Sequence, residues 1–494
     1  MVATRCVAGA EPPPPASDVM VLRLVAIAAG GRQQSRTRLR RMSRDASYSG
    51  APLSLSGGTT TEQGGELVTD GLTEGQDETG NHERPAHVAD ATTVLSIEEF
   101  PVAPEPAEPE PDVAESDVGP RVLLLGSDDC SLELAVALRR LGAEVMTADA
   151  DTVTDADELT AVAEGVQPDF VVTLTDGVDV VALDGLEAQD IELVPSARGV
   201  RLTADREGLR RLAADELGLP TAPFWFVESL AELEAVAAHA GFPLLVKPIL
   251  GPNHAGRSVV EGADEVARAW ERATAGGGSR VWAETVVDIE FLVTLIVVRS
   301  EGPSGPLLEF CTPIGHRSDD TGALESWQPQ EMTPAALDAA KSIAARIVKS
   351  LGGRGVYSVE LMINGDEVYF AEVSAGLPDS AWITLRSQRL SAFELQARTV
   401  LGVAVDTMMV SPGAARVIDH GPAAPGVAPS GELLAAALGV PESDLRVFGP
   451  AAAEQPIATS AKWGVALATA PDVATARDRA REVAARLSVR DSRA

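Results

Sequence analysis

Apolar residues alternate between short continuous runs and helical spacing from residue 121 onward. The runs predict strands, and the i, i+3, i+4 spacing between them predicts helices. Strands that alternate with helices are typical of a parallel sheet covered on both faces. We therefore predict a Rossmann-like N-terminal α/β domain over residues 119–205. The predicted strands are 121–127, 144–148 and 169–174, and the predicted helices are 132–141 and about 155–165.

The turn after the first strand bears on cofactor choice. It contains Gly126-Ser-Asp-Asp-Cys-Ser131, which lacks the spaced glycines of a dinucleotide-binding turn. The adjacent carboxylates of Asp128 and Asp129 would also repel a pyrophosphate. A nicotinamide cofactor is therefore not expected here.

A second block of helices and strands begins near residue 202. Asp205 is the expected N-cap of a helix that Gly218 ends. The apolar strand 241–248 carries Lys247 near its end, and a buried ammonium needs an anionic partner. Phosphate is one such partner. Gly251 and Gly256 follow, and their loop either cradles phosphates with backbone N–H groups or is an ordinary loop. The strands 257–260, 280–287 and 291–298 are predicted next.

The segment 359–373 predicts a β-hairpin around Asn364-Gly-Asp366. Each strand carries one glutamate, Glu360 and Glu372. A two-residue loop would place these carboxylates on opposite faces, whereas a three-residue loop pairs 364 with 368 and sets the glutamates opposite each other.

Facing carboxylates destabilise a sheet unless a cation lies between them. Mg²⁺ binds carboxylates together with substrate phosphates, so the three-residue register predicts a metal site at Glu360 and Glu372. The alternative is an ordinary hairpin with two solvated glutamates. The residues of the hairpin alone leave both open.

Residues 1–118 have a composition typical of disorder. They contain a proline run at 12–15, an arginine-rich run at 32–44 and a Pro/Glu/Ala tract at 101–111. Such a segment buries too little apolar surface to offset its ordering entropy. The sequence leaves open whether the true start lies further along the chain. As a signal peptide, the short apolar segment 19–31 is poor, because its basic residues follow rather than precede it.

Composition excludes several classes of partner. The 494 residues carry a formal net charge of −33, which argues against nucleic acid and anionic membranes. Three scattered cysteines form no disulfide framework or zinc motif and suit a reducing, cytoplasmic compartment. No apolar run is long enough to span a membrane.

Taken together, these segments resemble the ATP-grasp superfamily, and within it the formate-dependent phosphoribosylglycinamide formyltransferases of purine biosynthesis. The resemblance covers 119–494 and implies an ATP-grasp domain over 206–401 and a small C-terminal domain over 402–494. The motifs that carry it are Val194-Pro-Ser-Ala-Arg198, Leu202-Thr-Ala-Asp-Arg-Glu-Gly-Leu-Arg-Arg211, Pro313-Ile-Gly-His-Arg317, Glu325-Ser-Trp-Gln-Pro-Gln330, Val359-Glu-Leu361 with Glu372-Val-Ser374, and Trp463-Gly-Val-Ala-Leu-Ala468.

The resemblance implies ATP and Mg²⁺ as cofactors, and it assigns roles by position. A carboxylate attacks the γ-phosphate of ATP, and an amine captures the resulting acyl phosphate. The family is dimeric, so a homodimer is implied. The implied ATP-binding residues are Arg206, Lys247, Gly256, Arg257, Glu284 and Val287, the metal ligands are Glu360 and Glu372, and the substrate candidates are Asp379, His316, Arg317 and Lys462. His316 is equally well explained as a structural histidine, and Asp319-Asp320 as a solvated loop.

The chain departs from the family at both ends of the implied site. The ribotide-contacting Glu-Leu of the first turn is Asp129-Cys130 here. The family's three cations for the ribotide phosphate fall in segments 446–450 and 460–463, and of these cations only Lys462 remains. Residues 251–257 correspond to the family's ATP loop. This segment contains Pro252, and Ala255 stands where the family has a lysine. Three hypotheses follow: an ATP-grasp enzyme with a changed acceptor, a catalytically degenerate nucleotide-binding or assembly module, and the unmodified family activity.

Overall fold

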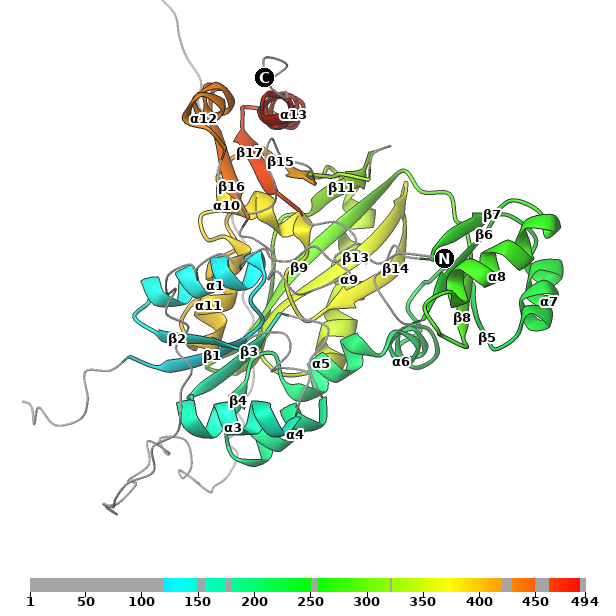
Figure 1. The fold of residues 1–494 in the computed structure, drawn as a ribbon, viewed down its shortest axis with the longest axis horizontal. Coiled ribbons are helices and arrows are strands. Elements are labelled where there is room, and N and C mark those ends of the chain that lie inside the picture. Colours follow the sequence, from blue (N-terminus) through cyan, green and yellow to red (C-terminus); the bar gives the residue numbers. More distant parts are fainter. Residues whose placement is uncertain are drawn as a thin grey trace, which may run out of the picture. The chain divides into compact units, whose positions relative to one another are not determined.

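The computed structural model describes residues 119–148, 156–174, 180–249, 256–319, 322–419, 429–448 and 462–488. All of these belong to one compact unit, residues 107–494. Its strands form three sheets, which Figure 1 shows in sequence colours. The predicted N-terminal extension, 1–118, lies outside the described residues, and the predicted domain boundaries stay predictions.

The first sheet is the predicted parallel sheet. Its strand order is β2-β1-β3-β4, and every pairing is parallel. The sequence prediction of an α/β fold at this end of the chain is thus confirmed. The strands are β1 (Arg121–Leu125), β2 (Glu144–Ala148), β3 (Phe170–Thr173) and β4 (Glu192–Leu193), and the helices are α1 (Asp129–Arg140), α3 (Ala156–Val166), α4 (Val180–Ala188) and α5 (Ala197–Ala204).

The second sheet is small and antiparallel, in the order β5-β8-β6-β7. The helices α7 and α8 pack on it through one apolar cluster that includes Leu233, Ala269 and Val281. The strand with Lys247 lies inside this sheet, between β8 and β7. The elements are β5 (Phe224–Val227), α7 (Leu230–Ala240), β6 (Leu244–Pro248), β7 (Ser258–Val260), α8 (Val266–Thr274) and β8 (Val281–Thr285).

The third sheet has nine antiparallel strands in the order β14-β13-β9-β11-β12-β15-β17-β16, with β10 paired to β9. It therefore joins the hairpin with Glu360 and Glu372 to the C-terminal strands. Its members are β9 (Phe291–Gly302), β10 (Gly305–Phe310), β11 (Ile314–Ser318), β12 (Leu324–Gln328), β13 (Gly355–Asn364), β14 (Glu367–Ser374), β15 (Gly413–Ile418), β16 (Ser443–Val447) and β17 (Gly464–Thr469).

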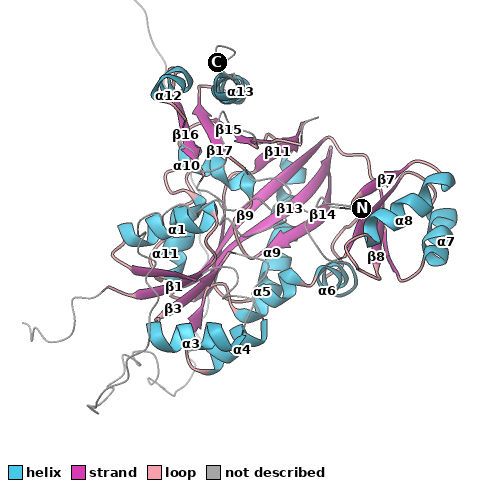
Figure 2. Ribbon diagram, in the orientation of Figure 1, coloured by secondary structure: helices cyan, strands magenta, loops and turns pink. Residues whose placement is uncertain are grey.

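Helices pack on this large sheet, as the secondary-structure colours of Figure 2 show. The longest, α9 (Pro334–Leu351), begins at the N-cap Thr333 and buries one face against β9 and the hairpin. The remaining elements are α6 (Arg206–Arg211) with the π-helical turn η1 (Leu212–Glu216), the 3₁₀ turn η3 (Asp379–Ile383), α10 (Thr384–Ser387), α11 (Ala392–Val400), α12 (Gly431–Leu438) and α13 (Val473–Ser488).

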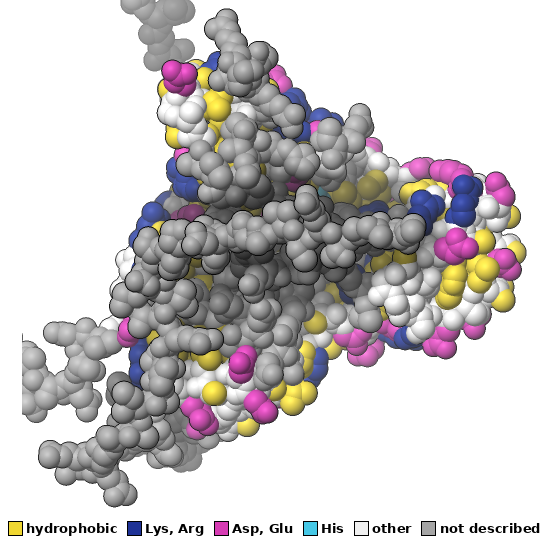
Figure 3. Space-filling view, viewed as in Figure 1, with side chains coloured by type: hydrophobic (Ala, Val, Ile, Leu, Met, Phe, Trp, Pro, Cys, Tyr) yellow, Lys and Arg dark blue, Asp and Glu magenta, His cyan; other side chains and the backbone are white. Residues whose placement is uncertain are grey.

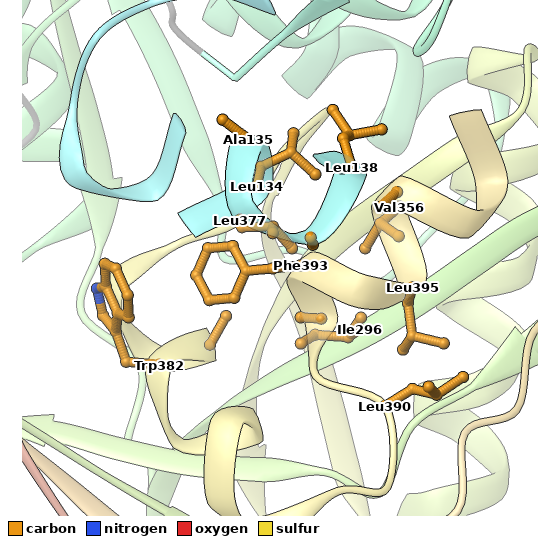
Figure 4. Close-up of a cluster of buried hydrophobic side chains, with 14 of the residues drawn as sticks. Leu134, Ala135, Leu138, Ile296, Val356, Leu377, Trp382, Leu390, Phe393 and Leu395 are labelled. Carbon is orange, nitrogen blue, oxygen red and sulfur yellow. The ribbon is translucent and has the colours of Figure 1, made fainter. Parts of the chain in front are cut away.

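The largest apolar core joins the first sheet to the third. Leu134 and Leu138 of α1 pack over Phe393 of α11, with Ile296 of β9 beneath them (Figure 4). The ring of Trp382 in η3 lies 5.0 Å from that of Phe393, centroid to centroid. This packing sets the beginning of α1 close to η3, where two of the predicted substrate residues lie.

A second core holds α6 against the hairpin. Leu209 of α6 belongs to the same buried cluster as Leu361 and Phe370 of the hairpin. The N-cap of α6 is Asp205, as predicted, whose carboxylate accepts from the Gly208 N–H at 2.9 Å. α6 therefore begins at a defined point beside the two glutamates.

The described surface carries charges of both signs. On the face drawn in Figure 3, acidic side chains lie among basic ones over α7 and α8. Within the described ranges, no helix combines the length and apolar character needed to cross a bilayer. The exclusion of nucleic acid stays a prediction from net charge.

Candidate active site

The hairpin places Glu360 of β13 directly opposite Glu372 of β14. The predicted pairing is confirmed, but the predicted three-residue loop is wrong. Asn364 pairs with Glu367, so the loop contains two residues, and Gly365 supplies the positive φ of +57° that it needs.

A β-bulge restores the pairing that the short loop would have prevented. The loop register continues to Leu361 opposite Phe370 and then shifts by one residue, so that Glu360 faces Glu372. Ala371 is the extra residue. Because side chains alternate between the faces of a strand, one inserted residue turns Glu372 to the face of Glu360.

The two facing carboxylates repel each other, because both carry negative charge when ionised. Burial raises the pKa of Glu360 to about 7, and the negative charge of Glu372 adds to that rise. Glu360 is half-buried, which does not fit the alternative of a solvated glutamate. Among the described residues no cluster of three or more His, Cys, Asp or Glu could hold a metal alone. A pair of carboxylates suits Mg²⁺, because substrate phosphates and water supply the remaining ligands of this ion.

Lys247 lies over an aromatic floor beside a carboxylate. Its Nζ is 3.0 Å from Glu284 Oε1 and 3.6 Å from the centre of the Trp282 ring. Burial lowers the pKa of Lys247, and the charge of Glu284 opposes that shift. The anionic partner that the sequence predicted for this lysine is therefore a carboxylate in the structure, from a residue that the resemblance assigned to the adenine.

Arg206 and Glu372 line the same small cavity, together with Arg210 and Trp282. The Arg206 guanidinium also lies 3.5 Å from the Ile249 carbonyl at the end of β6. Two predicted ATP ligands, Arg206 and Lys247, are thus brought to the side of the hairpin that carries Glu372. We call this set, with Glu284 and Glu360, the nucleotide end.

The other predicted ATP residues lie next to strands β7 and β8 of the second sheet. Gly256 has a φ of +75°, and a Cβ there would lie 2.8 Å from the Arg272 carbonyl, so the position requires glycine. Arg257 is exposed at the start of β7, and Val287 is half-buried just after β8. The altered ATP loop, including Pro252 and Ala255, lies outside the described residues.

A second group of charges, the acceptor end, lies where α1 meets η3. Lys462 forms an ion pair with Asp379. Burial would lower the pKa of Lys462, but Asp379 outweighs it and the pKa is raised. Cys130 lies close by, and its pKa is raised by burial and by Asp128 and Asp379. Two of the predicted substrate residues are therefore together.

Arg446 is a cation at the acceptor end that the sequence analysis missed. Its Nε lies 3.7 Å from Glu133 of α1, and its Nη1 lies 2.8 Å from Asp444, which also pairs with Arg386. The signal was present, because Arg446 opens the segment that was compared with the family's phosphate-binding cations. Each of these cations is already matched by a carboxylate.

His316 and Arg317 lie in neither group. His316 of β11 is buried, and burial lowers its pKa to about 4, so the ring is neutral at pH 7. Arg317 Nε lies 3.1 Å from Glu325. Burial would raise the pKa of Glu325, but hydrogen bonds from Arg477 and Arg481 outweigh it and lower the pKa to about 2.

The acidic residue beside them corrects a further expectation. Asp319 was predicted to lie in a solvated loop, but it is half-buried and pairs with Arg416 of β15. The reason is the sheet order, since β15 pairs with β12 and brings Arg416 opposite Glu325 near the end of β11. Its neighbour Asp320 lies outside the described residues.

Comparison with known proteins shows which protein class has this fold and site. The ATP-grasp domain family model matches residues 212–393, which contain Lys247 and the hairpin. A structure of an N5-carboxyaminoimidazole ribonucleotide synthetase from Thermus thermophilus has a TM-score of 0.62 at 23% identity, covering 74% of this chain and 98% of its own, which shows the shared fold alone. The chain is an ATP-grasp protein.

Relatives define the family within that class. Formate-dependent phosphoribosylglycinamide formyltransferases from Corynebacterium glutamicum (strain R) and Rhodococcus jostii (strain RHA1) are each 43% identical, over 75% and 74% of this chain and 94% of their own length. The structure of glycinamide-RNase-transformylase T from Mycobacterium tuberculosis is 60% identical, with a TM-score of 0.64, over 74% of this chain and all of its own. The chain belongs to the formate-dependent phosphoribosylglycinamide formyltransferase family.

Proposed function

We propose that this protein uses Mg²⁺ and ATP to activate a small carboxylate, formate in the family, and transfers the acyl group to an amine. The observation that carries the proposal is the facing pair of Glu360 and Glu372, with Arg206 in the same cavity as Glu372 and Lys247 over the Trp282 ring that lines this cavity. Like charges opposite each other cost stability, so their placement favours a cation-binding role over a structural one.

Each residue of the nucleotide end has a role in this chemistry. Glu360 and Glu372 hold Mg²⁺, which neutralises the triphosphate when bound. Arg206 and Lys247 supply positive charge to the phosphates, and Glu284 holds the Lys247 ammonium in place at 3.0 Å. No protein nucleophile is needed, because catalysis consists of positioning and charge neutralisation.

The reaction balances without further reagents. A carboxylate oxygen attacks the γ-phosphorus, the bond to the β-phosphate oxygen breaks, and ADP leaves. The amine nitrogen then attacks the acyl carbon, inorganic phosphate leaves with the bond electrons, and the nitrogen releases a proton. The Asp379 carboxylate at the acceptor end can accept a hydrogen bond from a neutral acceptor amine.

We further propose that the acceptor carries less negative charge than the family's ribotide. The support is the acceptor end, where Lys462 is paired with Asp379 and Arg446 with Asp444 and Glu133. The segments of 119–488 that the structure leaves undescribed contain no lysine or arginine. A phosphate would therefore have to displace a carboxylate from each cation.

Titration calorimetry tests the first part of this proposal. The full chain is titrated with the non-hydrolysable analogue AMP-PNP, with and without Mg²⁺. Metal-dependent binding supports the proposal, and phosphate release with formate and a set of amines then identifies the acceptor. An absence of binding would contradict the proposal and favour the catalytically degenerate module.

Phosphoribosylglycinamide as acceptor tests the second part. Turnover that saturates at lower concentrations of this ribotide than of unphosphorylated amines would overturn the proposed acceptor change. The similarity to named relatives favours that outcome, and the paired cations favour the opposite one.

A further inference from the structure

We infer that Arg210 is the positioning residue of the metal-binding pair, because its guanidinium holds the bulge that turns Glu372 toward Glu360. The inference rests on the proposed metal site and extends it to a side chain outside the pair. Arg210 lies on α6. Figure 1 shows this helix between the hairpin and the sheet of β5 to β8.

The bulge needs an external support. Without the bulge, the two-residue loop would pair Glu360 with Ala371 and leave Glu372 on the opposite face. An inserted residue leaves backbone groups outside the ladder, and buried carbonyls need donors. The contacts around Ala371 therefore decide which way Glu372 points.

Arg210 supplies these donors. Its Nη1 donates to the Phe370 carbonyl at 3.1 Å, and its Nη2 donates to the Ala371 carbonyl at 2.9 Å. One guanidinium thus binds the two consecutive carbonyls at the bulge. The Phe370 N–H donates to the Pro220 carbonyl at 2.7 Å.

The guanidinium is itself fixed from the second sheet. It lies 4.6 Å from the centre of the Trp282 ring, and its Nη2 is 3.6 Å from Glu284. Its side chain is 3% exposed, so it has no room to turn away. Because Glu284 also holds Lys247, one buried network joins the ATP-binding lysine to the register of the metal-binding pair.

Arginine is required by the geometry rather than by charge alone. Two carbonyls are bound in parallel, and the planar fork of a guanidinium matches them, whereas a lysine ammonium is a single point. Supporting contacts of this kind change metal affinity about 10- to 100-fold when they are lost. We expect Arg210→Lys to keep the positive charge but to lose the bulge that sets Glu372 opposite Glu360.

Manganese binding to the full chain, followed by electron paramagnetic resonance without nucleotide, is the test. We expect Arg210→Lys to weaken Mn²⁺ binding at least about tenfold. Arg211→Lys, on the neighbouring exposed arginine that pairs with Glu207 instead, is the matched control and should bind as the unaltered chain does. Equal affinity in Arg210→Lys and the unaltered chain would overturn the inference.

A double-variant cycle with Glu372→Gln separates positioning from general stability. If Arg210 acts through Glu372, Arg210→Lys should weaken Mn²⁺ binding no further once Glu372 is changed. Independent, additive losses would overturn the inference. If Arg210→Lys does not fold, Glu284→Gln is the substitute, since it removes the charged partner of Arg210; unchanged Mn²⁺ affinity there would also overturn it. An unaltered chain that binds no Mn²⁺, either alone or with AMP-PNP, would instead refute the proposed metal site itself.

Discussion

The nucleotide end and the acceptor end differ in how their charges are balanced. At the nucleotide end, Glu360 and Glu372 face each other, and the pKa of Glu360 is raised to about 7 by burial and by that neighbour. At the acceptor end, Lys462 and Arg446 are each matched by carboxylates. An unbalanced pair favours a bound cation or a retained proton, whereas a neutralised cluster needs neither. The comparison therefore predicts a retained cation site and a weakened phosphate site.

The largest expected effect comes from breaking the unbalanced pair. Glu360→Gln and Glu372→Gln should each weaken Mg²⁺-dependent nucleotide binding about 100-fold. This is near the upper end of the roughly 1.5–3 kcal/mol that a lost charged contact costs, because the metal is shared with the phosphates. Titration calorimetry with AMP-PNP measures this loss.

The same variants change stability in the opposite direction without metal. Relief of like-charge repulsion should stabilise the hairpin by up to about 1 kcal/mol in urea unfolding with EDTA. Glu367→Gln, exposed on the same hairpin, is the control and should change neither quantity. Stabilisation with intact nucleotide binding would mean that the pair holds no metal.

The next effect concerns the lysine of the nucleotide end. Lys247→Met should weaken Mg²⁺-ATP binding about 10- to 100-fold by removing one charged phosphate contact. It should also destabilise the fold by about 1–3 kcal/mol, because Glu284 loses its partner at 3.0 Å. Calorimetry and thermal unfolding measure the two effects.

A double variant separates these two roles of Lys247. Lys247→Met with Glu284→Gln should recover stability but not nucleotide affinity, since the orphaned charge is removed while the phosphate contact stays lost. Lys349→Met, on the exposed face of α9, is the control. Recovery of both quantities would show that Lys247 serves the fold alone.

A gain of binding is expected at the acceptor end. Asp379→Asn frees the Lys462 ammonium, so affinity for phosphoribosylglycinamide should rise about tenfold, the value of one charge-assisted contact of about 1.5 kcal/mol. Inhibition or turnover assays with the ribotide measure this change. Asp338→Asn, exposed on α9, is the control. A loss of ribotide binding in Asp379→Asn would instead indicate that the carboxylate contacts the acceptor amine.

The sequence predicted most of the elements because their signals are local. Strand β2 was expected at 144–148 and is found there, and the N-cap Asp205 was identified from its position before an apolar helix. The pairing of Glu360 with Glu372 was also expected, but for the wrong reason. The bulge at Ala371 depends on Arg210, 161 positions away in the chain, and no local pattern encodes that contact.

The state of the acceptor end was hidden from the sequence for the same reason. The loss of family cations could be counted, but the pairing of Lys462 with Asp379 and of Arg446 with Glu133 requires the fold. Likewise, Asp319 was expected in solvent because Arg416 is 97 positions away in the chain. The sequence predicts which residues are charged, but it does not predict which charged residues pair with each other in the fold.

The last expected effect is a pH dependence that sharpens the comparison. In the unfolded chain Glu360 releases its proton near pH 4.5, but in the fold it keeps the proton until about pH 7. The metal-free fold therefore binds more protons in that window, and its stability should fall as pH rises from about 4.5 to about 7, by about 1–2 kcal/mol after allowance for partial exposure.

Urea unfolding at pH 5 and pH 8, with EDTA, measures this fall, and comparison with Glu360→Gln isolates the contribution of Glu360. Saturating Mg²⁺ should abolish the fall, because the metal displaces the proton and stabilises the ionised pair. The affinity for Mg²⁺ should accordingly decrease below pH 7 and level off above it. An identical pH dependence in the unaltered chain and in Glu360→Gln would mean that Glu360 is ionised without a cation, and the contrast between the two ends would then rest on the acceptor end alone.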